Sequence, residues 1–103
     1  MPDNLSLTDE SPTLVAQLPP VVLWNLRRYA LNHVPVGSFL TAVLANDLRE
    51  AVCRADETNL LSLRAIVLYV YNCLPDRCHG NLENVRAWLA RPPAPPLDAA
   101  GRE

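Results

Sequence analysis

Apolar residues recur at three- and four-residue spacing through most of residues 18–91, and this spacing restricts the region to helices. Proline, glycine and acidic residues interrupt the pattern at three places. They divide the region into four predicted helices, which cover approximately residues 20–32, 38–55, 58–74 and 82–91. Residues 67–71 would also suit a strand, but the chain offers no second strand to pair with it. We therefore predict an all-α fold, a compact bundle of three main helices plus a short C-terminal helix.

The two ends of the chain lack this pattern. Residues 1–17 combine Pro, Ser, Thr and Asp without sustained periodicity, and residues 92–103 begin with a proline-rich run. We predict a flexible N-terminal tail over residues 1–17, one helical domain over residues 18–91, and a disordered Pro-rich tail over residues 92–103. The Pro-rich run would adopt an extended polyproline conformation, as a stiff spacer or as a ligand for an aromatic groove.

Length and composition narrow the functional classes. At 103 residues the chain is expected to form one domain. A domain of this size buries a limited share of its surface and is marginally stable, so association into an oligomer would stabilise it. The absence of an 18-residue apolar run argues against a membrane span, and the N-terminus lacks the basic and apolar regions of a signal peptide. Three cysteines suit a disulfide framework poorly, which favours a cytoplasmic location.

The charge distribution argues against nucleic acid as a partner. Residues 21–91 carry eight Arg against six acidic residues, a net charge of +2, whereas residues 1–20 carry −3 and residues 92–103 carry −1. Nucleic-acid-binding domains usually have a stronger basic patch than this. All nine basic residues are Arg, a bias that codon usage explains more simply than phosphate recognition does.

The second predicted helix has a strongly apolar face, and Asp47 falls within it. The apolar positions are Leu40, Val43, Leu44, Leu48, Ala51, Val52 and Ala55. Asp47 either lies at the edge of this face and reaches water, or is partly buried and must accept hydrogen bonds. Its natural donors would be backbone N–H groups at another helix start, or an Arg. We expect Asp47 to be a structural residue held at a junction between helices.

The third and fourth predicted helices are expected to complete the core. Residues 58–74 carry apolar stripes on two sides, so this helix should be buried on both and lie centrally. The stripes comprise Leu60, Leu63, Val67, Val70, Tyr71 and Leu74 on one side, and Leu61, Ala65 and Leu68 on the other. Asn81 is predicted to cap the last helix, and we expect Trp88 to anchor that helix to the bundle.

The connector before the last helix is dense in polar and reactive side chains. Residues 71–81 contain two Cys, one His, two Asn and one Arg, and binding residues concentrate on loops. We predict that the loop of residues 76–81 and the flanking face of the last helix form a binding surface, although the same loop residues would also shape a turn and cap a helix. The candidate binding residues are Arg77, His79, Asn81 and Asn84, together with Arg27 and Arg28 on the first helix.

The sequence argues against metal binding and catalysis. Cys73, Cys78 and His79 could bind zinc with His33 as the fourth ligand, but the adjacent Cys78 and His79 would have to bend sharply to share one metal. A catalytic cysteine would need a base within reach in space, held by a third group. No Gly-rich phosphate loop, paired-carboxylate site or metalloprotease motif is present. We therefore predict no enzyme activity, no bound metal and no cofactor.

Two segments resemble a family of small uncharacterised bacterial and phage or prophage proteins. The first is GSFLTAVLANDL at residues 37–48, and the second is LPDRCHG at residues 74–80 with Val85, Trp88 and Leu89. Family members tend to carry Trp where this chain has His79. The resemblance covers approximately residues 20–90. It implies a small cytoplasmic domain in a phage-like context, with no assigned activity.

Together these features predict a non-enzymatic helical interaction protein of phage or prophage origin, which binds a host protein partner and self-associates. Two alternatives stay open. One is an oligomeric binder of a small anionic ligand such as a nucleotide signal, and the other is a DNA-binding helical regulator. Stacking faces and guanidinium groups for an anionic ligand would come from Trp24, Arg27, Arg28, Tyr69 and Arg77.

Overall fold

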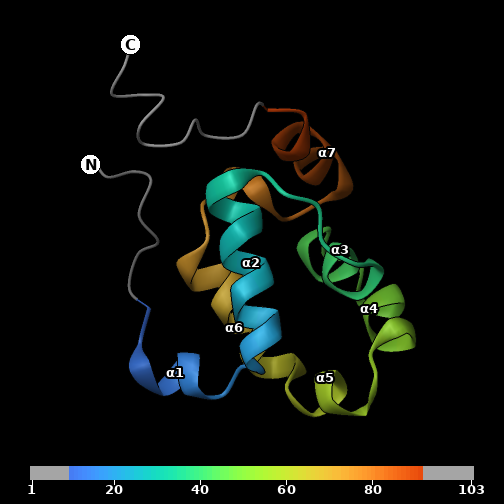
Figure 1. Cartoon of the computed structure of the whole chain (residues 1–103). Helices are drawn as coiled ribbons and strands as arrows, with labels where there is room; N and C mark the ends of the chain where they lie inside the picture. Colours follow the sequence, from blue (N-terminus) through green and yellow to red (C-terminus); the bar gives the residue numbers. More distant parts are fainter. Residues whose placement is uncertain (1–9, 92–103) are drawn as a thin grey trace.

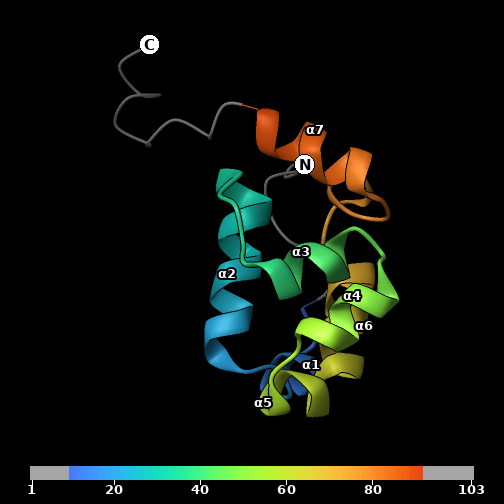
Figure 2. The same cartoon turned by 90° about the vertical axis from the view of Figure 1, so that its right-hand side faces the viewer.

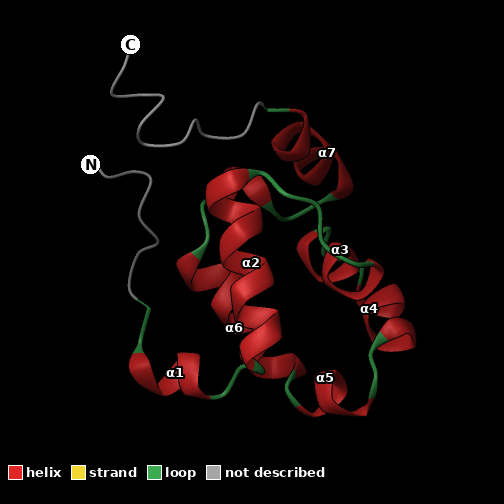
Figure 3. Ribbon diagram, in the orientation of Figure 1, coloured by secondary structure: helices red, strands yellow, loops and turns green. Residues whose placement is uncertain are grey.

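The computed structural model describes residues 10–91, in which helices joined by loops are present and no strand occurs (Figures 1 and 3). The predicted all-α class is therefore confirmed for this part of the chain, whereas residues 1–9 and the predicted tail at 92–103 lie outside it. The helices are α1 (Pro12–Ala16), α2 (Pro20–Asn32), α3 (Ser38–Leu44), α4 (Leu48–Arg54), α5 (Glu57–Leu61), α6 (Leu63–Cys73), the 3-10 turn η2 (Asp76–Cys78) and α7 (Leu82–Ala90).

The two longest helices, α2 and α6, run through the molecule, with α7 across one end and α1 and α5 at the other (Figures 1 and 2). Helices α3 and α4 lie beside them and face the viewer in Figure 2. Every helix within residues 10–91 is too short or too polar to cross a bilayer. The largest fully buried side chains come from α2, α3, α6, η2 and α7, and are Leu26, Tyr29, Leu44, Ile66, Tyr69, Cys73, Cys78 and Val85.

Helix α2 begins and ends where the sequence indicates. Pro20 is its first residue, a position where the missing N–H costs nothing. His33 follows its last residue in the left-handed conformation, with φ of 59°, and donates its backbone N–H to the carbonyl of Tyr29 at 3.1 Å. The His33 ring lies 4.5 Å from the Trp88 ring, and its Nδ1 is 2.9 Å from the Trp88 carbonyl oxygen. The end of α2 is thus tied to α7.

The predicted helix over residues 38–55 is wrong, because the chain forms two helices there. Asn46 is left-handed, with φ of 61°, and ends α3. Asp47 then caps α4 by accepting a hydrogen bond from the N–H of Glu50 at 3.2 Å. Asp47 does lie at a helix junction and accepts from a helix start, but its side chain is exposed rather than buried. Asn in the left-handed region and Asp at an N-cap are both favourable, so the break is stable.

Asp47→Ala is expected to lower the free energy of unfolding by about 1 kcal/mol, because an exposed N-cap acceptor is lost without opening a cavity. Asp47→Asn is the matched control, since it keeps a side-chain oxygen in the same position. Its free energy of unfolding should fall by only a few tenths of a kcal/mol. Urea unfolding followed by circular dichroism measures both. An Asp47→Ala midpoint equal to that of the wild type would contradict the capping role.

The predicted helix over residues 58–74 is also divided. Asp56 caps α5 by accepting from the N–H of Asn59 at 2.7 Å, and Ser62 separates α5 from α6. The apolar residues before and after Ser62 therefore lie on two different helices, and their three- and four-residue spacing does not place them on one face of a single helix. Helix α6 buries one side only, and the prediction that it is buried on two sides is wrong. The buried residues of α6 are Ala65, Ile66, Tyr69, Val70 and Cys73.

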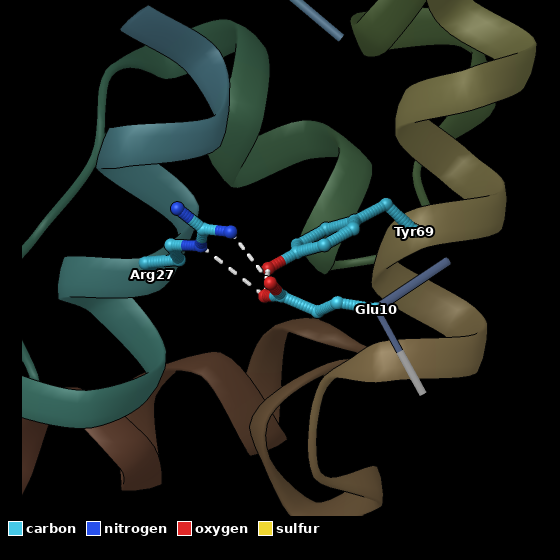
Figure 4. Close-up of polar contacts among 3 residues, drawn as sticks. All are labelled: Glu10, Arg27 and Tyr69. Carbon is cyan, nitrogen blue, oxygen red and sulfur yellow. Dashed lines mark hydrogen bonds and ion pairs between the residues drawn. The ribbon is translucent and has the colours of Figure 1, made fainter. Parts of the chain in front are cut away.

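Residues 10–17 differ from the predicted flexible tail, because they form α1 and contact the bundle. The Glu10 carboxylate accepts from Arg27 Nη2 at 2.5 Å and from Arg27 Nε at 3.2 Å, and the Tyr69 hydroxyl also donates to it (Figure 4). Leu14 and Val15 on α1 pack against the core. Glu10 thus joins the N-terminal segment to both α2 and α6.

Glu10→Gln is expected to lower the free energy of unfolding by about 1 kcal/mol at neutral pH, since Arg27 is partly exposed and water screens the pair. The hydrogen bond from Arg27 holds the pKa of Glu10 below its ordinary value, and the Tyr69 hydroxyl contributes in the same direction. The folded state therefore favours the carboxylate. Its stabilisation is present above the pKa of the unfolded chain and is lost as pH falls through the folded pKa. Thermal unfolding should show the two proteins converging in acid, and a constant difference at all pH values would contradict this account.

Candidate interaction surface

The loop of residues 75–81 contains the segment 76–81, predicted to be a binding surface, and hydrogen bonds tie the middle and the C-terminal end of the loop to the fold. The Tyr29 hydroxyl donates to the Cys78 carbonyl at 2.7 Å, and the N–H of Gly80 donates to the Leu44 carbonyl at 2.7 Å. Asn81 accepts from the N–H of Asn84 at 2.7 Å and caps α7. These contacts satisfy backbone groups that folding would otherwise leave without partners.

Two of the four loop candidates thus have structural contacts. Asn84 donates its side-chain N–H to the His79 carbonyl at 2.9 Å, while Asn81 caps α7. His79 is buried, with 7% of its surface exposed. Arg77 is exposed and forms no ion pair or side-chain hydrogen bond within residues 10–91. Arg77 is therefore the loop candidate whose side chain is most available to a partner.

The Nε2 atom of His79 is buried and has no hydrogen-bond partner within the described residues. Burial lowers the pKa of His79, against the opposing effects of a backbone hydrogen bond at Leu74 and the charge of Asp76. The imidazole is consequently neutral at physiological pH. It lines a small cavity of about 70 Å³ together with Val43, Tyr71 and Gly80.

The residues considered as zinc ligands are engaged elsewhere. His33 contacts the Trp88 carbonyl, and both Cys73 and Cys78 are buried. Within residues 10–91 no group of three or more His, Cys, Asp or Glu side chains is arranged to hold a metal ion. Burial raises the pKa of the Cys78 thiol to about 12, so it is protonated at neutral pH and a poor nucleophile.

The arginines proposed for anion contacts on α2 are also occupied. Arg27 binds Glu10, as described above, and Arg28 lies over the Trp24 ring at 4.6 Å. Neither Arg27, Arg28 nor Arg77 lines the three hollows that α3, α4 and α6 border in the described chain. None of these three hollows therefore brings the guanidinium groups together.

The largest of these hollows is an open cleft of about 470 Å³ between α3, α4 and the start of α7. Its polar lining includes Asp47 and Glu50, and Arg54 is paired with Glu50 at 2.9 Å. Two carboxylates against one guanidinium give the cleft a negative balance. Its charge therefore disfavours an anionic ligand.

A second hollow, of about 170 Å³, lies on the other side of the α3–α4 junction, between α4 and α6. Its lining is mainly apolar and includes Leu48, Ala51, Leu63 and Val67. It shares Val67 with the smaller cavity beside His79, as well as residues of α3 and its C-terminal turn. The two hollows therefore adjoin each other, and we call the pair the α4–α6 groove.

Large apolar side chains border this groove and remain exposed. On α4, Leu48 is 70% exposed, and on α6, Tyr71 is 74% exposed. Val67 lines both hollows and is 43% exposed, and Val52 lies one turn beyond Leu48 on α4 and is 44% exposed. We call these four residues the α4–α6 surface. Leu60 and Leu61 on α5 are also exposed.

Sequence reasoning missed this surface because it assigned these residues to the buried stripes of longer helices. One signal in the sequence could have revealed it. Asp47 followed by Glu50 three residues later is typical of a helix start, and Asn46 directly before it is typical of a helix end. A break at this point changes which side of the following helix faces the core, so Leu48 and Val52 need not continue the buried stripe.

A scan against protein-family models gives no match for this chain, and searches of curated proteins and of solved structures give none either. The candidate surface therefore rests on the geometry of residues 10–91.

Proposed function

We propose that the protein is a non-enzymatic helical interaction module that acts in the cytoplasm and binds another protein through the α4–α6 surface. The observation that carries the proposal is the pair of adjoining hollows in the α4–α6 groove, lined by exposed Leu48, Val67 and Tyr71. Contiguous exposed apolar side chains around a groove are typical of protein-binding sites. An exposed aromatic such as Tyr71 is typical of the residues that dominate the affinity of an interface.

Two further expectations belong to this proposal. We also propose a phage or prophage origin, on the segments at residues 37–48 and 74–80, and hence a host protein as one partner. The small size of the folded part supports self-association, because a domain of this size buries a limited fraction of its apolar surface.

The alternative functions receive less support from the geometry. An anionic ligand would need converging arginines, yet Glu10 occupies Arg27, and the cleft between α3, α4 and the start of α7 carries more negative than positive charge. DNA binding would need a basic face, whereas residues 10–91 carry eight Arg against seven acidic residues, a net charge of +1. Helix α7 is also short, and its buried face holds Val85 and Trp88.

The test compares affinity-tagged full-length protein with the double variant Leu48→Glu, Tyr71→Ser. Both side chains are mostly exposed, so the thermal midpoint should stay near that of the wild type. Recovery of protein partners, including a differently tagged copy of the chain, should fall by about tenfold or more. Quantitative mass spectrometry of the recovered proteins provides the measurement.

Arg77→Ala is the matched control, because it removes an exposed side chain of the loop of residues 75–81 without touching the groove. It should recover the same partners as the wild type. A folded double variant with undiminished recovery would contradict the proposal. If Arg77→Ala alone lost the partners, the interaction surface would be the loop of residues 75–81 and not the groove.

A further inference from the structure

Helix α4 buries far fewer residues than α3, the other seven-residue helix in the described part of the chain. Of its seven residues only Ala51 is buried, while Leu48 and Val52 stand exposed along one side at four-residue spacing. Helix α5, which follows it, has no buried residue. Covering an exposed apolar stripe stabilises a helix, so another molecule packed against α4 would bury area that the single chain leaves in water.

The shape beside α4 is self-complementary. Leu48 and Val52, which we call the α4 ridge, are both exposed and lie one turn apart on α4, and the mainly apolar hollow between α4 and α6 is beside them, since Leu48 also lines it. A two-fold symmetric contact sets the same patch of both copies face to face. It therefore needs a projection and a hollow in one patch, so that each copy inserts its ridge into the groove of the other. This surface provides both.

The helices of this surface carry charges of both signs, and the carboxylate-bearing residue Asp47 lines the groove itself. Arg49 on α4, Arg64 on α6 and Glu57 on α5 are exposed, and none of them forms an ion pair within residues 10–91. Arg64 precedes Val67 by three residues, so it lies next to the exposed stripe of α6. A partner of a single charge sign would leave one of these groups opposite a like charge. A second copy brings both signs and can pair each Arg with a carboxylate.

We propose that a second copy of this chain occupies the α4–α6 surface, in a two-fold symmetric dimer with α4 at its centre. This inference rests on the function proposed above and names the partner at the same surface. Leu48 and Val52 of each copy enter the groove of the other, and Arg49 of each copy faces Glu57 of the other.

Sedimentation velocity of the purified full-length chain over a wide range of concentrations tests the proposal. The wild type should shift from monomer to dimer, and Leu48→Glu should raise the dissociation constant by about a hundredfold or more, because a charge enters an apolar contact. Arg49→Glu and Glu57→Arg should each weaken the dimer by about tenfold, and the protein with both changes should recover. Trp24→Ser removes an exposed aromatic from α2 and is the matched control, which should dimerise like the wild type.

Cys53 provides a second readout at the same surface. It is the exposed cysteine and follows Val52 on α4, whereas Cys73 and Cys78 are buried. Alkylation of Cys53 by N-ethylmaleimide should slow by about tenfold when the concentration is raised until nearly all of the protein is dimer. The Leu48→Glu variant should react at the fast rate at every concentration.

Three results would overturn the inference. A dimer that is insensitive to Leu48→Glu and leaves Cys53 alkylation unchanged has its interface elsewhere. Failure of the doubly reversed variant to recover would exclude the two-fold pairing of Arg49 with Glu57. A monomer at every concentration would remove the second copy from the surface. The pull-down of host proteins separates this inference from the proposed function. If a protein that does not dimerise still recovers host proteins, and the Leu48→Glu, Tyr71→Ser variant loses them, the proposed function stands and only this inference fails. If that variant recovers host proteins undiminished, both fail.

Discussion

Trp88→Ala is expected to lower the free energy of unfolding by about 3–5 kcal/mol, a large share of the stability of a domain of this size. Trp88 is buried, and its Nε1–H donates to the Tyr29 carbonyl at 2.9 Å. Its ring also lies against His33 at the end of α2. Truncation would leave a cavity between α2 and α7 and remove the hydrogen bond that joins these helices.

The loss should spread beyond α7. Asn84 on the same helix holds the His79 carbonyl, and Tyr29 holds the Cys78 carbonyl, so displacement of α7 loosens the turn of residues 76–80 as well. We therefore expect Trp88→Ala to unfold cooperatively at a much lower urea concentration rather than to fray at one end.

Two control variants separate the contributions of Trp88. Trp88→Phe keeps an aromatic ring and removes the N–H, so it should cost about 1 kcal/mol for the hydrogen bond together with a smaller packing loss. Trp24→Ala should stay close to the wild type, because Trp24 is 57% exposed. Urea unfolding followed by circular dichroism measures all three proteins. A Trp88→Ala midpoint near that of the wild type would mean that α7 is not needed to hold the bundle together.

The predictions made from sequence succeeded where one residue type has a strong local effect. The prolines at 20 and 35 mark the ends of α2, and Asn81 marks the start of α7, so both helices lie where their sequence signals indicate. The helical class followed from apolar spacing, which depends on local geometry rather than on distant partners. These features could be predicted because each is determined within a few residues of chain.

The divided helices needed a comparison of competing signals. Apolar spacing continues through Asn46 and Asp47, which favours one long helix, whereas the capping preferences of these two residues favour a break. In the structure the break prevails at both this point and Ser62. Residues 10–17 were missed for a different reason, since the contact of Glu10 with Arg27 and Tyr69 joins positions far apart in the sequence.

The candidate site depended almost wholly on tertiary arrangement. Polar side chains in the loop of residues 75–81 looked like binding groups, but the loop is used to satisfy buried backbone carbonyls and to cap α7. Apolar stripes on α4 and α6 looked like core, yet part of each stays exposed. Neither outcome is encoded in local spacing, because burial depends on which neighbours cover a helix face.

Leu44→Ala and Leu48→Ala test that conclusion directly. These leucines are four residues apart, so one uninterrupted helix would bury both on the same stripe, with similar costs on truncation. In the structure Leu44 is fully buried at the end of α3, and Leu48 is 70% exposed on α4. We expect Leu44→Ala to cost about 2–5 kcal/mol, and Leu48→Ala to stay within about 0.5 kcal/mol under conditions where the protein is monomeric.

The matched pair makes this comparison sensitive, since both variants remove the same atoms from the same residue type. Thermal and urea unfolding at low protein concentration measure the intrinsic difference. Raising the concentration should then lower the stability of Leu48→Ala relative to the wild type, because only the wild-type side chain gains burial in the dimer. Equal losses at the two positions at low concentration would mean that residues 38–55 form a single helix, and the α4–α6 surface would then not exist.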